Sequence, residues 1–143
     1  MNTVCAWSTP LAITLSDIYG SEHRDQYFEW MRTQRPQLGA TLFTRVSDQL
    51  FIAHMLVNNG LQSPQNENPL VYAALAKCLN HVAERARTMH ATIHTTRIGH
   101  GRAGADWRRV EALLKRAAHN QSITVYTLPT KTHGDIQSFR RNE

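Results

Sequence analysis

Apolar residues recur at helical spacing in the first third of this chain and cluster at strand spacing directly after it. Residues 10–19 and 21–34 are predicted to form helices, because apolar side chains return every few positions. The positions that carry this pattern are Leu11, Ile13, Leu15, Ile18, Tyr27, Trp30 and Met31. Residues 41–46 and 49–56 are rich in β-branched and aromatic residues, and they predict a β-hairpin with its turn at residues 47–48.

Helices and strands alternate in the second half of the chain. Asn68 is the predicted N-cap of a long helix, and Pro69 is its predicted first residue. The apolar positions of this helix are Val71, Leu75, Leu79, Val82 and Ala86. A strand at residues 91–98, a helix at 106–120 and a strand at 122–128 follow. The last three elements predict a right-handed β-α-β unit with parallel strands, and therefore an α/β domain.

The length of the chain allows one domain with a substantial core. We expect a single domain over residues 1–129, and a flexible polar and basic tail over residues 130–143 after Pro129. A hydrophobic content of 41% is typical of a globular domain. No apolar run of membrane-spanning length and no secretory leader is visible, which favours a cytoplasmic protein without a membrane partner.

Charge, cysteine and histidine content narrow the kinds of site. Sixteen Lys and Arg against eleven acidic residues give a formal charge of +5, which suits anionic partners. Cys5 and Cys78 form neither a disulfide framework nor a CxxC pair. The eight histidines are scattered without metal-ligand spacing. We therefore expect no metal site and no cofactor.

The clearest chemical signal is a glycine-rich loop, residues 97–107, between a predicted strand and a predicted helix. Gly99, Gly101 and Gly104 let the backbone turn sharply and approach a ligand closely. The following helix offers unpaired N–H groups and the positive end of its dipole, with Asp106 as its predicted N-cap. Such a loop is suited to hold phosphate, although a tight connection that binds nothing is an alternative.

The spacing of the three glycines also satisfies the GxGxxG fingerprint of dinucleotide-binding proteins. That fingerprint belongs to the first strand-helix unit of a larger fold, with an acidic residue about 20 positions further on. Here only one predicted strand follows the loop, and the next acidic residue after Glu111 is Asp135. A Rossmann NAD site is therefore rejected.

Four segments carry a resemblance to the macro domain family: residues 41–46, 70–88, 97–101 and 125–128. The chain looks most like small bacterial macro domains similar to the human terminal ADP-ribose protein glycohydrolase. The resemblance covers about residues 2–129, and its most specific part is the Arg-Ile-Gly-x-Gly sequence before a Trp-bearing helix. It implies a three-layer α/β/α fold with a mixed sheet, and binding of ADP-ribose or of ADP-ribosylated protein or nucleic acid.

The resemblance also implies a set of ligand-binding residues. The loop from Gly99 to Gly104 would cradle the diphosphate and the distal ribose, Asn2 would lie near the proximal ribose, and Tyr126 near the adenine. The complete set is Asn2, Gly99, His100, Gly101, Arg102, Ala103, Gly104 and Tyr126. An ordinary half-buried strand tyrosine is the alternative interpretation of Tyr126.

The chain departs from this family at its beginning. Similar macro domains have two earlier strands, one of them central in the sheet, and glycines at positions where this chain has Cys5, Ser8 and Pro10. A missing central strand would leave unpaired backbone groups. We therefore expect a truncated start, or assembly by strand exchange or as a homodimer.

Catalytic residues of the human relative are also replaced. That relative uses a lysine after the hairpin and an aspartate in the loop, but this chain has no lysine before Lys77 and has Ala103 at the aspartate position. We favour a binding module for ADP-ribose. A hydrolase of ADP-ribose derivatives that uses a positioned water, with Asn2, Asn58 and Asn59 as candidates, is the first alternative. A degenerate protein acting in protein or nucleic-acid interaction is the second.

Overall fold

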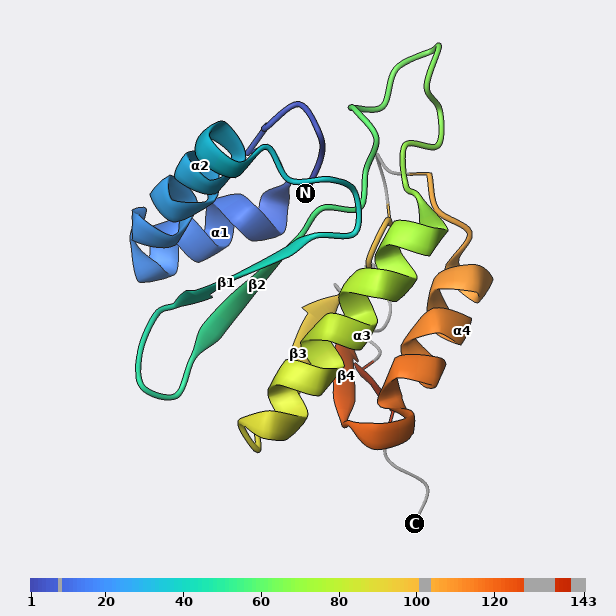
Figure 1. The fold of residues 1–143 in the computed structure, drawn as a ribbon. Helices are drawn as coiled ribbons and strands as arrows, with labels where there is room; N and C mark the ends of the chain where they lie inside the picture. Colours follow the sequence, from blue (N-terminus) through green and yellow to red (C-terminus); the bar gives the residue numbers. More distant parts are fainter. Residues whose placement is uncertain (8, 101–103, 128–135, 140–143) are drawn as a thin grey trace.

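The computed structural model describes residues 1–7, 9–100, 104–127 and 136–139. Helices and strands alternate along most of the chain (Figure 1). In order they are α1 (Pro10–Tyr19), α2 (Glu22–Gln34), β1 (Thr41–Arg45), β2 (Phe51–Met55), α3 (Tyr72–Thr88), β3 (Ile93–Thr96), α4 (Trp107–Ala117), a short 3-10 helix (Ala118–Asn120), β4 (Ile123–Tyr126) and β5 (Ile136–Phe139). The α/β class predicted from the sequence is confirmed.

The described strands form two sheets rather than the one mixed sheet that was expected. β1 and β2 make an antiparallel hairpin, while β3, β4 and β5 make a mixed sheet in that order. β3 pairs with β4 in parallel, as the predicted β-α-β unit requires, and β5 pairs with β4 antiparallel. The pattern of apolar residues predicts strands but not which edges pair, so it could not reveal this division.

Helices lie on both faces of the β1–β2 hairpin, and α3 also reaches the second sheet (Figure 1). Because side chains alternate along a strand, Leu42 packs against the α2 residues Tyr27 and Trp30. Its neighbour Phe43 points the other way and meets His81 of α3, with 6.2 Å between ring centroids. α3 contacts β1, β2, β3 and α4, so this one helix joins the two sheets.

The main core lies between α3, α4 and the parallel strands. α3 is amphipathic and buries Leu75, Cys78 and Leu79, while α4 contributes Val110 and Leu114. Full burial of one such leucine or valine side chain stabilises the fold by about 1.5–3 kcal/mol. This core fixes β3 and α4 relative to one another, and with them the two ends of the glycine-rich loop.

The predicted start of the long helix was wrong. α3 begins at Tyr72, and neither Asn68 nor Pro69 caps or opens it. Leu70 instead forms a bridge with Asn58, and the Val71 N–H donates to the Val57 carbonyl at 2.8 Å. These backbone bonds hold the approach to α3 extended, so a tertiary pairing overrides the local Asn-Pro signal. The predicted bounds of α1 are confirmed at both ends.

The beginning of the chain lies beside residue 58. Asn2 forms a parallel bridge with Asn58, and the Thr3 N–H donates to the Asn58 carbonyl at 3.0 Å.

The C-terminal part of the chain holds a second feature that the sequence did not predict. β5 lies within the segment expected to be a polar tail, with Ile136 opposite Tyr126 and Phe139 opposite Ile123.

Candidate ligand-binding site

The glycine-rich loop leaves the carboxyl end of β3 and enters the N-terminus of α4 (Figure 1). Because β3 and β4 are parallel, the loop and the end of β4 lie at the same edge of the sheet. Ligands of open α/β sheets bind at this edge. Gly101, Arg102 and Ala103 lie outside the described residues, so the geometry below concerns the two sides of the loop.

Gly99 occupies a position that only glycine fits without strain. Its φ is +74°, and a Cβ built there would lie 2.5 Å from the Cβ of Ala105. The Gly99 carbonyl accepts a hydrogen bond from the Ala105 N–H at 3.2 Å, which draws the two sides of the loop together. The loop is therefore narrow at its base, and Gly99 lets the chain turn there.

Gly104 presses against a second segment. Its φ is +58°, and a built Cβ would lie 2.5 Å from Asn68 Oδ1 and 2.7 Å from the Glu67 carbonyl oxygen. The second of these neighbours is backbone and has little freedom to move away. Gly104 is thus the point where the glycine-rich loop meets the loop of residues 60–68.

Aromatic and polar contacts fix the end of the loop that enters α4. The guanidinium of Arg97 lies 4.4 Å from the Trp107 ring centroid, so one side chain at each end of the loop stacks on the other. The Tyr72 hydroxyl accepts a hydrogen bond from the Asp106 N–H at 2.8 Å. Asp106 Oδ1 accepts from the Arg108 N–H at 2.9 Å, which confirms the predicted N-cap.

His100 is exposed within the loop. Its backbone N–H donates to the Arg97 carbonyl at 3.3 Å, so this N–H serves the turn. The N-terminus of α4 lies directly after the loop, and its first turn has no acidic residue other than the Asp106 cap. A helix N-terminus favours an anion, so the loop and helix together can hold phosphate.

Asn2 is buried, with 4% of its surface exposed. Its Oδ1 accepts from the Val4 N–H at 3.2 Å and from the Ala6 N–H at 3.1 Å, and its Nδ2 donates to the Ala6 carbonyl at 3.2 Å. The side chain therefore organises the turn that follows it. Cys5 in this turn has a φ of +58°, a left-handed conformation that glycine adopts more easily.

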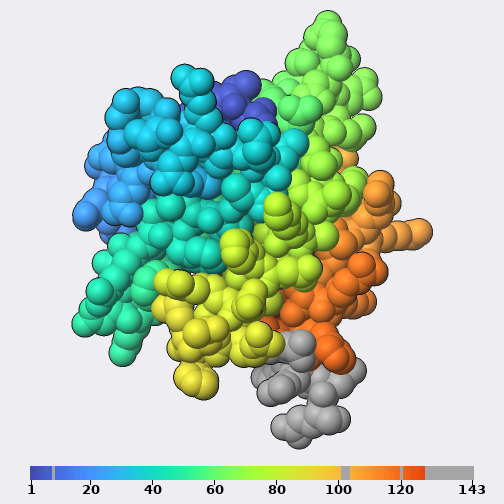
Figure 2. Space-filling view, viewed as in Figure 1, coloured from blue at the N-terminus to red at the C-terminus, as the bar shows by residue number. Residues whose placement is uncertain are grey.

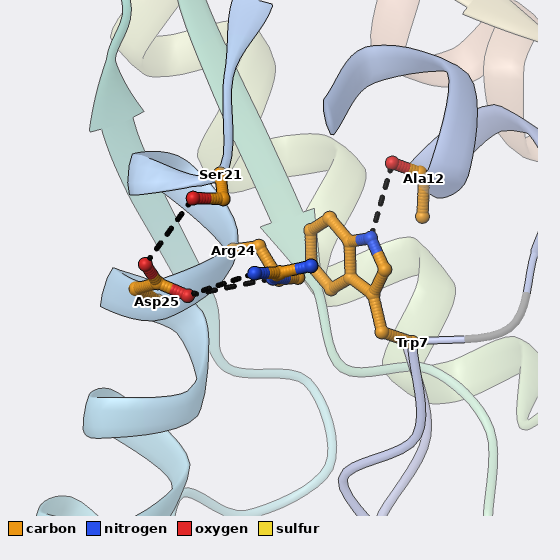
Figure 3. Close-up of polar contacts among 5 residues, drawn as sticks. All are labelled: Trp7, Ala12, Ser21, Arg24 and Asp25. Atoms are coloured by element: carbon orange, nitrogen blue, oxygen red, sulfur yellow. Dashed lines mark hydrogen bonds and ion pairs between the residues drawn. The ribbon is translucent and has the colours of Figure 1, made fainter. Parts of the chain in front are cut away.

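The Trp7 side chain contacts α1 and α2 and so holds this N-terminal turn against them (Figure 3). Its Nε1 donates to the Ala12 carbonyl at 3.1 Å, and its ring centroid lies 5.5 Å from those of His23 and Tyr27. Figure 3 also shows Asp25 bonded to Ser21 and Arg24 near the start of α2. The turn that carries Asn2 and Cys5 is therefore held by an aromatic cluster.

His54, which belongs to the same cluster, is 2% exposed, and its Nε2 lies 2.9 Å from the Thr44 hydroxyl. Burial, and after it the nearby His23, lower the pKa of His54 to about 3. His23 is 3% exposed, and burial also lowers its pKa. Both imidazoles are therefore neutral at pH 7, and the cluster is an uncharged support.

Tyr126 lies at the end of β4 with 42% of its surface exposed. Its hydroxyl is 2.9 Å from His94 Nδ1, and His94 Nε2 is 2.9 Å from the Thr92 hydroxyl. The rings of Tyr126 and His94 are stacked at 25° with centroids 5.8 Å apart. Sequence reasoning missed His94 and Thr92. His94 lies in β3 and Thr92 directly precedes this strand, but the register with β4 is needed to find Tyr126 beside His94.

An open hollow of about 580 Å³ lies where the two loops meet. It is lined by Gln62, Ser63, Pro64, Glu67, Asn68 and Gly104. The 60–68 loop projects from the body at the top of the molecule (Figure 2). The amino-acid sequence of this segment carries no signal for a hollow.

Two further observations concern the described part of the chain. None of its helices is long and apolar enough to cross a membrane. The same residues contain no group of three or more His, Cys, Asp or Glu side chains that could hold a metal ion.

Comparison with known proteins shows which solved structures share this fold. No protein-family model matches the chain, and a search of curated proteins also finds no match. Among solved structures, the chain is similar to a protein of unknown function from Bacteroides thetaiotaomicron, with a TM-score of 0.83 and 29% identity over 90% of this chain and 83% of that one. It is also similar to a macrodomain protein from Streptomyces coelicolor, with a TM-score of 0.75 and 27% identity over 91% and 84%.

The macrodomain of Mycobacterium tuberculosis DarG has the same fold, with a TM-score of 0.72 and 18% identity over 91% of this chain and 86% of that one. These structures share the α/β architecture that positions the glycine-rich loop. The chain therefore has the fold of these macrodomain structures.

Proposed function

We propose that this protein binds ADP-ribose, free or attached to a macromolecule, through the glycine-rich loop. The observation that carries the proposal is the pair Gly99 and Gly104. Both have positive φ, and at both a Cβ would collide with a neighbour at 2.5 Å. At these two positions the backbone carries no side chain, which suits close approach to a diphosphate.

The surroundings of the loop support an anionic ligand. The N-terminus of α4 contributes its dipole, which stabilises a nearby anion by about 0.3–1 kcal/mol at an exposed site. The Arg97–Trp107 stack and the Tyr72–Asp106 hydrogen bond hold the two ends of the loop before any ligand arrives. A preorganised loop loses less conformational freedom on binding, which favours affinity. Tyr126, at the same edge of the sheet, supplies an exposed aromatic ring for a base.

Calorimetric titration with ADP-ribose tests the proposal, with AMP and NAD as comparison ligands. We expect saturable binding to the wild-type protein and its loss in Gly101→Glu, which adds a negative charge to the loop sequence. Gly20→Ala is the matched control, because Gly20 also has a positive φ but lies outside the site. A folded protein that takes up no ADP-ribose would contradict the proposal and favour an interaction protein without this ligand.

Hydrolysis of an ADP-ribose derivative is a second candidate function. The observation that favours it is Asn58 Oδ1, which is buried and has no hydrogen-bond partner among the described residues. An unsatisfied amide oxygen can accept a hydrogen bond from a water and orient it. Release of ADP-ribose from a modified protein, followed by mass spectrometry, tests this function. Release that is lost in Asn58→Ala while ADP-ribose binding persists would support it, and no release by the wild-type protein would contradict it.

A further inference from the structure

The hollow beside the glycine-rich loop shares one residue with it. Gly104 belongs both to the loop and to the wall of the hollow, and its built Cβ would lie 2.7 Å from the Glu67 carbonyl oxygen on the opposite side. A ligand whose diphosphate occupies the loop therefore has this hollow directly next to it. A volume of about 580 Å³ is large enough for one or two amino-acid side chains.

The wall formed by the 60–68 loop is held in place by its own hydrogen bonds. Ser63 and Asn66 exchange backbone hydrogen bonds at 3.1 and 2.9 Å. Asn66 Nδ2 donates to the carbonyls of Asn59 and Leu61 at 2.9 and 3.0 Å. Gln62 Nε2 donates to the Glu67 carbonyl at 3.2 Å. The projecting loop thus has a defined shape although much of it is exposed.

Among the described residues that line the hollow, Glu67 is the only ionisable one, and its charge is negative. Glu67 is exposed, and no ion pair joins it to any residue in the described part of the chain. The negative charge of Glu67 is opposite in sign to the net charge of the protein, which is +5. An anion is favoured at the glycine-rich loop, whereas a cation is favoured at Glu67, in the segment that meets this loop at Gly104.

We propose that the hollow is a subsite for a basic polypeptide to which ADP-ribose is attached, with Glu67 facing a lysine or arginine side chain of that polypeptide. This inference rests on the proposed function, because the loop must hold the diphosphate for the attached chain to reach the hollow. A backbone phosphate of a nucleic acid would instead place its negative charge against the Glu67 carboxylate. The charge of the hollow therefore favours protein over nucleic acid as the carrier.

The experiment compares four ligands by calorimetry at low and high salt. They are free ADP-ribose, a mono-ADP-ribosylated peptide flanked by lysines, the same peptide flanked by glutamates, and an ADP-ribosylated oligonucleotide. The proteins are wild type, Glu67→Gln and the control Glu84→Gln, which removes an exposed charge from α3 far along the sequence. Glu67→Gln keeps the size of the side chain and removes only its charge.

We expect the basic peptide to bind the wild-type protein about two- to five-fold more tightly than the acidic peptide at low salt, the size of one exposed ion pair. The preference should shrink at high salt and disappear in Glu67→Gln, but persist in Glu84→Gln. Free ADP-ribose should bind all three proteins equally well.

Two results would overturn the inference while leaving the proposed function intact. One is equal affinity for both peptides with normal binding of free ADP-ribose, and the other is tighter binding of the oligonucleotide than of the basic peptide. Failure of the wild-type protein to bind free ADP-ribose would contradict the proposed function itself, and the inference with it.

Discussion

Gly99 is the position where one added methyl group tests the geometry of the loop most sharply. Its φ is +74°, and the new Cβ would lie 2.5 Å from the Cβ of Ala105. A left-handed backbone costs a non-glycine residue about 1–2 kcal/mol. Overpacking against a neighbour adds about 1–3 kcal/mol. Gly99→Ala should therefore lower the free energy of unfolding by about 2–5 kcal/mol in total.

Gly20 provides the matched control for the backbone part of this cost. Its φ is +82°, but no atom lies within 4 Å of a Cβ built there. Gly20→Ala should therefore cost only the backbone contribution of about 1–2 kcal/mol. The difference between the two variants isolates the contact between residues 99 and 105.

Ala105→Gly removes the methyl group that Gly99→Ala would meet. In the double variant the collision disappears, so the two changes should be non-additive by about 1–3 kcal/mol in the favourable direction. Urea unfolding of the two single variants, the double variant, Gly20→Ala and the wild type measures this energy, provided that the m-value stays constant. Additive costs in the double variant, or equal costs for Gly99→Ala and Gly20→Ala, would refute the reasoning.

Three further predictions follow from the helix ends and the buried histidine. His90 has a φ of +53°, and the N–H groups of His90 and Ala91 donate to carbonyls of α3. Because glycine adopts this left-handed conformation more easily, His90→Gly should raise the free energy of unfolding by about 0.5–1 kcal/mol in urea titrations. A loss of stability would contradict this prediction. Folding lowers the pKa of His54 from 6.5 to about 3, so between pH 6.5 and 3 the unfolded chain binds one more proton at this residue than the folded chain does. The free energy of unfolding should therefore fall by up to about 1.4 kcal/mol for each pH unit as the pH is lowered. Unfolding at pH 7, 6 and 5 should show a shallower slope in His54→Gln, and an unchanged slope would count against the assignment. Asp106→Ala should cost about 1 kcal/mol as a lost N-cap, whereas Asp106→Asn should be nearly neutral; equal losses in thermal melts would show that capping is not its role.

Local signals in the sequence predicted the elements that build the site. The spacing of apolar residues predicted the bounds of α1, and the enrichment in β-branched and aromatic residues predicted the hairpin. The order strand, helix, strand predicted the parallel β3–β4 pair. Asp106 was predicted as the N-cap of α4 because a short acidic side chain precedes an apolar stripe, and its bond to the Arg108 N–H confirms it. These features depend on neighbouring residues, which a sequence displays directly.

Features that depend on distant contacts could not be predicted in this way. Asn68 and Pro69 form a strong local helix-start signal, but the pairing of Leu70 with Asn58 delays α3 to Tyr72. The contact of Tyr126 with His94 depends on strand register, and the hollow depends on two loops meeting at Gly104. The roles of the predicted ligand residues, and assembly by strand exchange, stay predictions.

The central claim is that the glycine-rich loop binds the diphosphate of ADP-ribose. A titration of the ¹⁵N-labelled protein with ADP-ribose, followed by two-dimensional NMR, tests it most directly, because glycine amides resonate in a separate region of the spectrum. The account predicts saturable shifts for the amides of Gly99 and Gly104 and for the first turn of α4, with Gly20 unchanged. Saturable shifts confined to other parts of the chain, or no shifts at all in a folded protein, would contradict it.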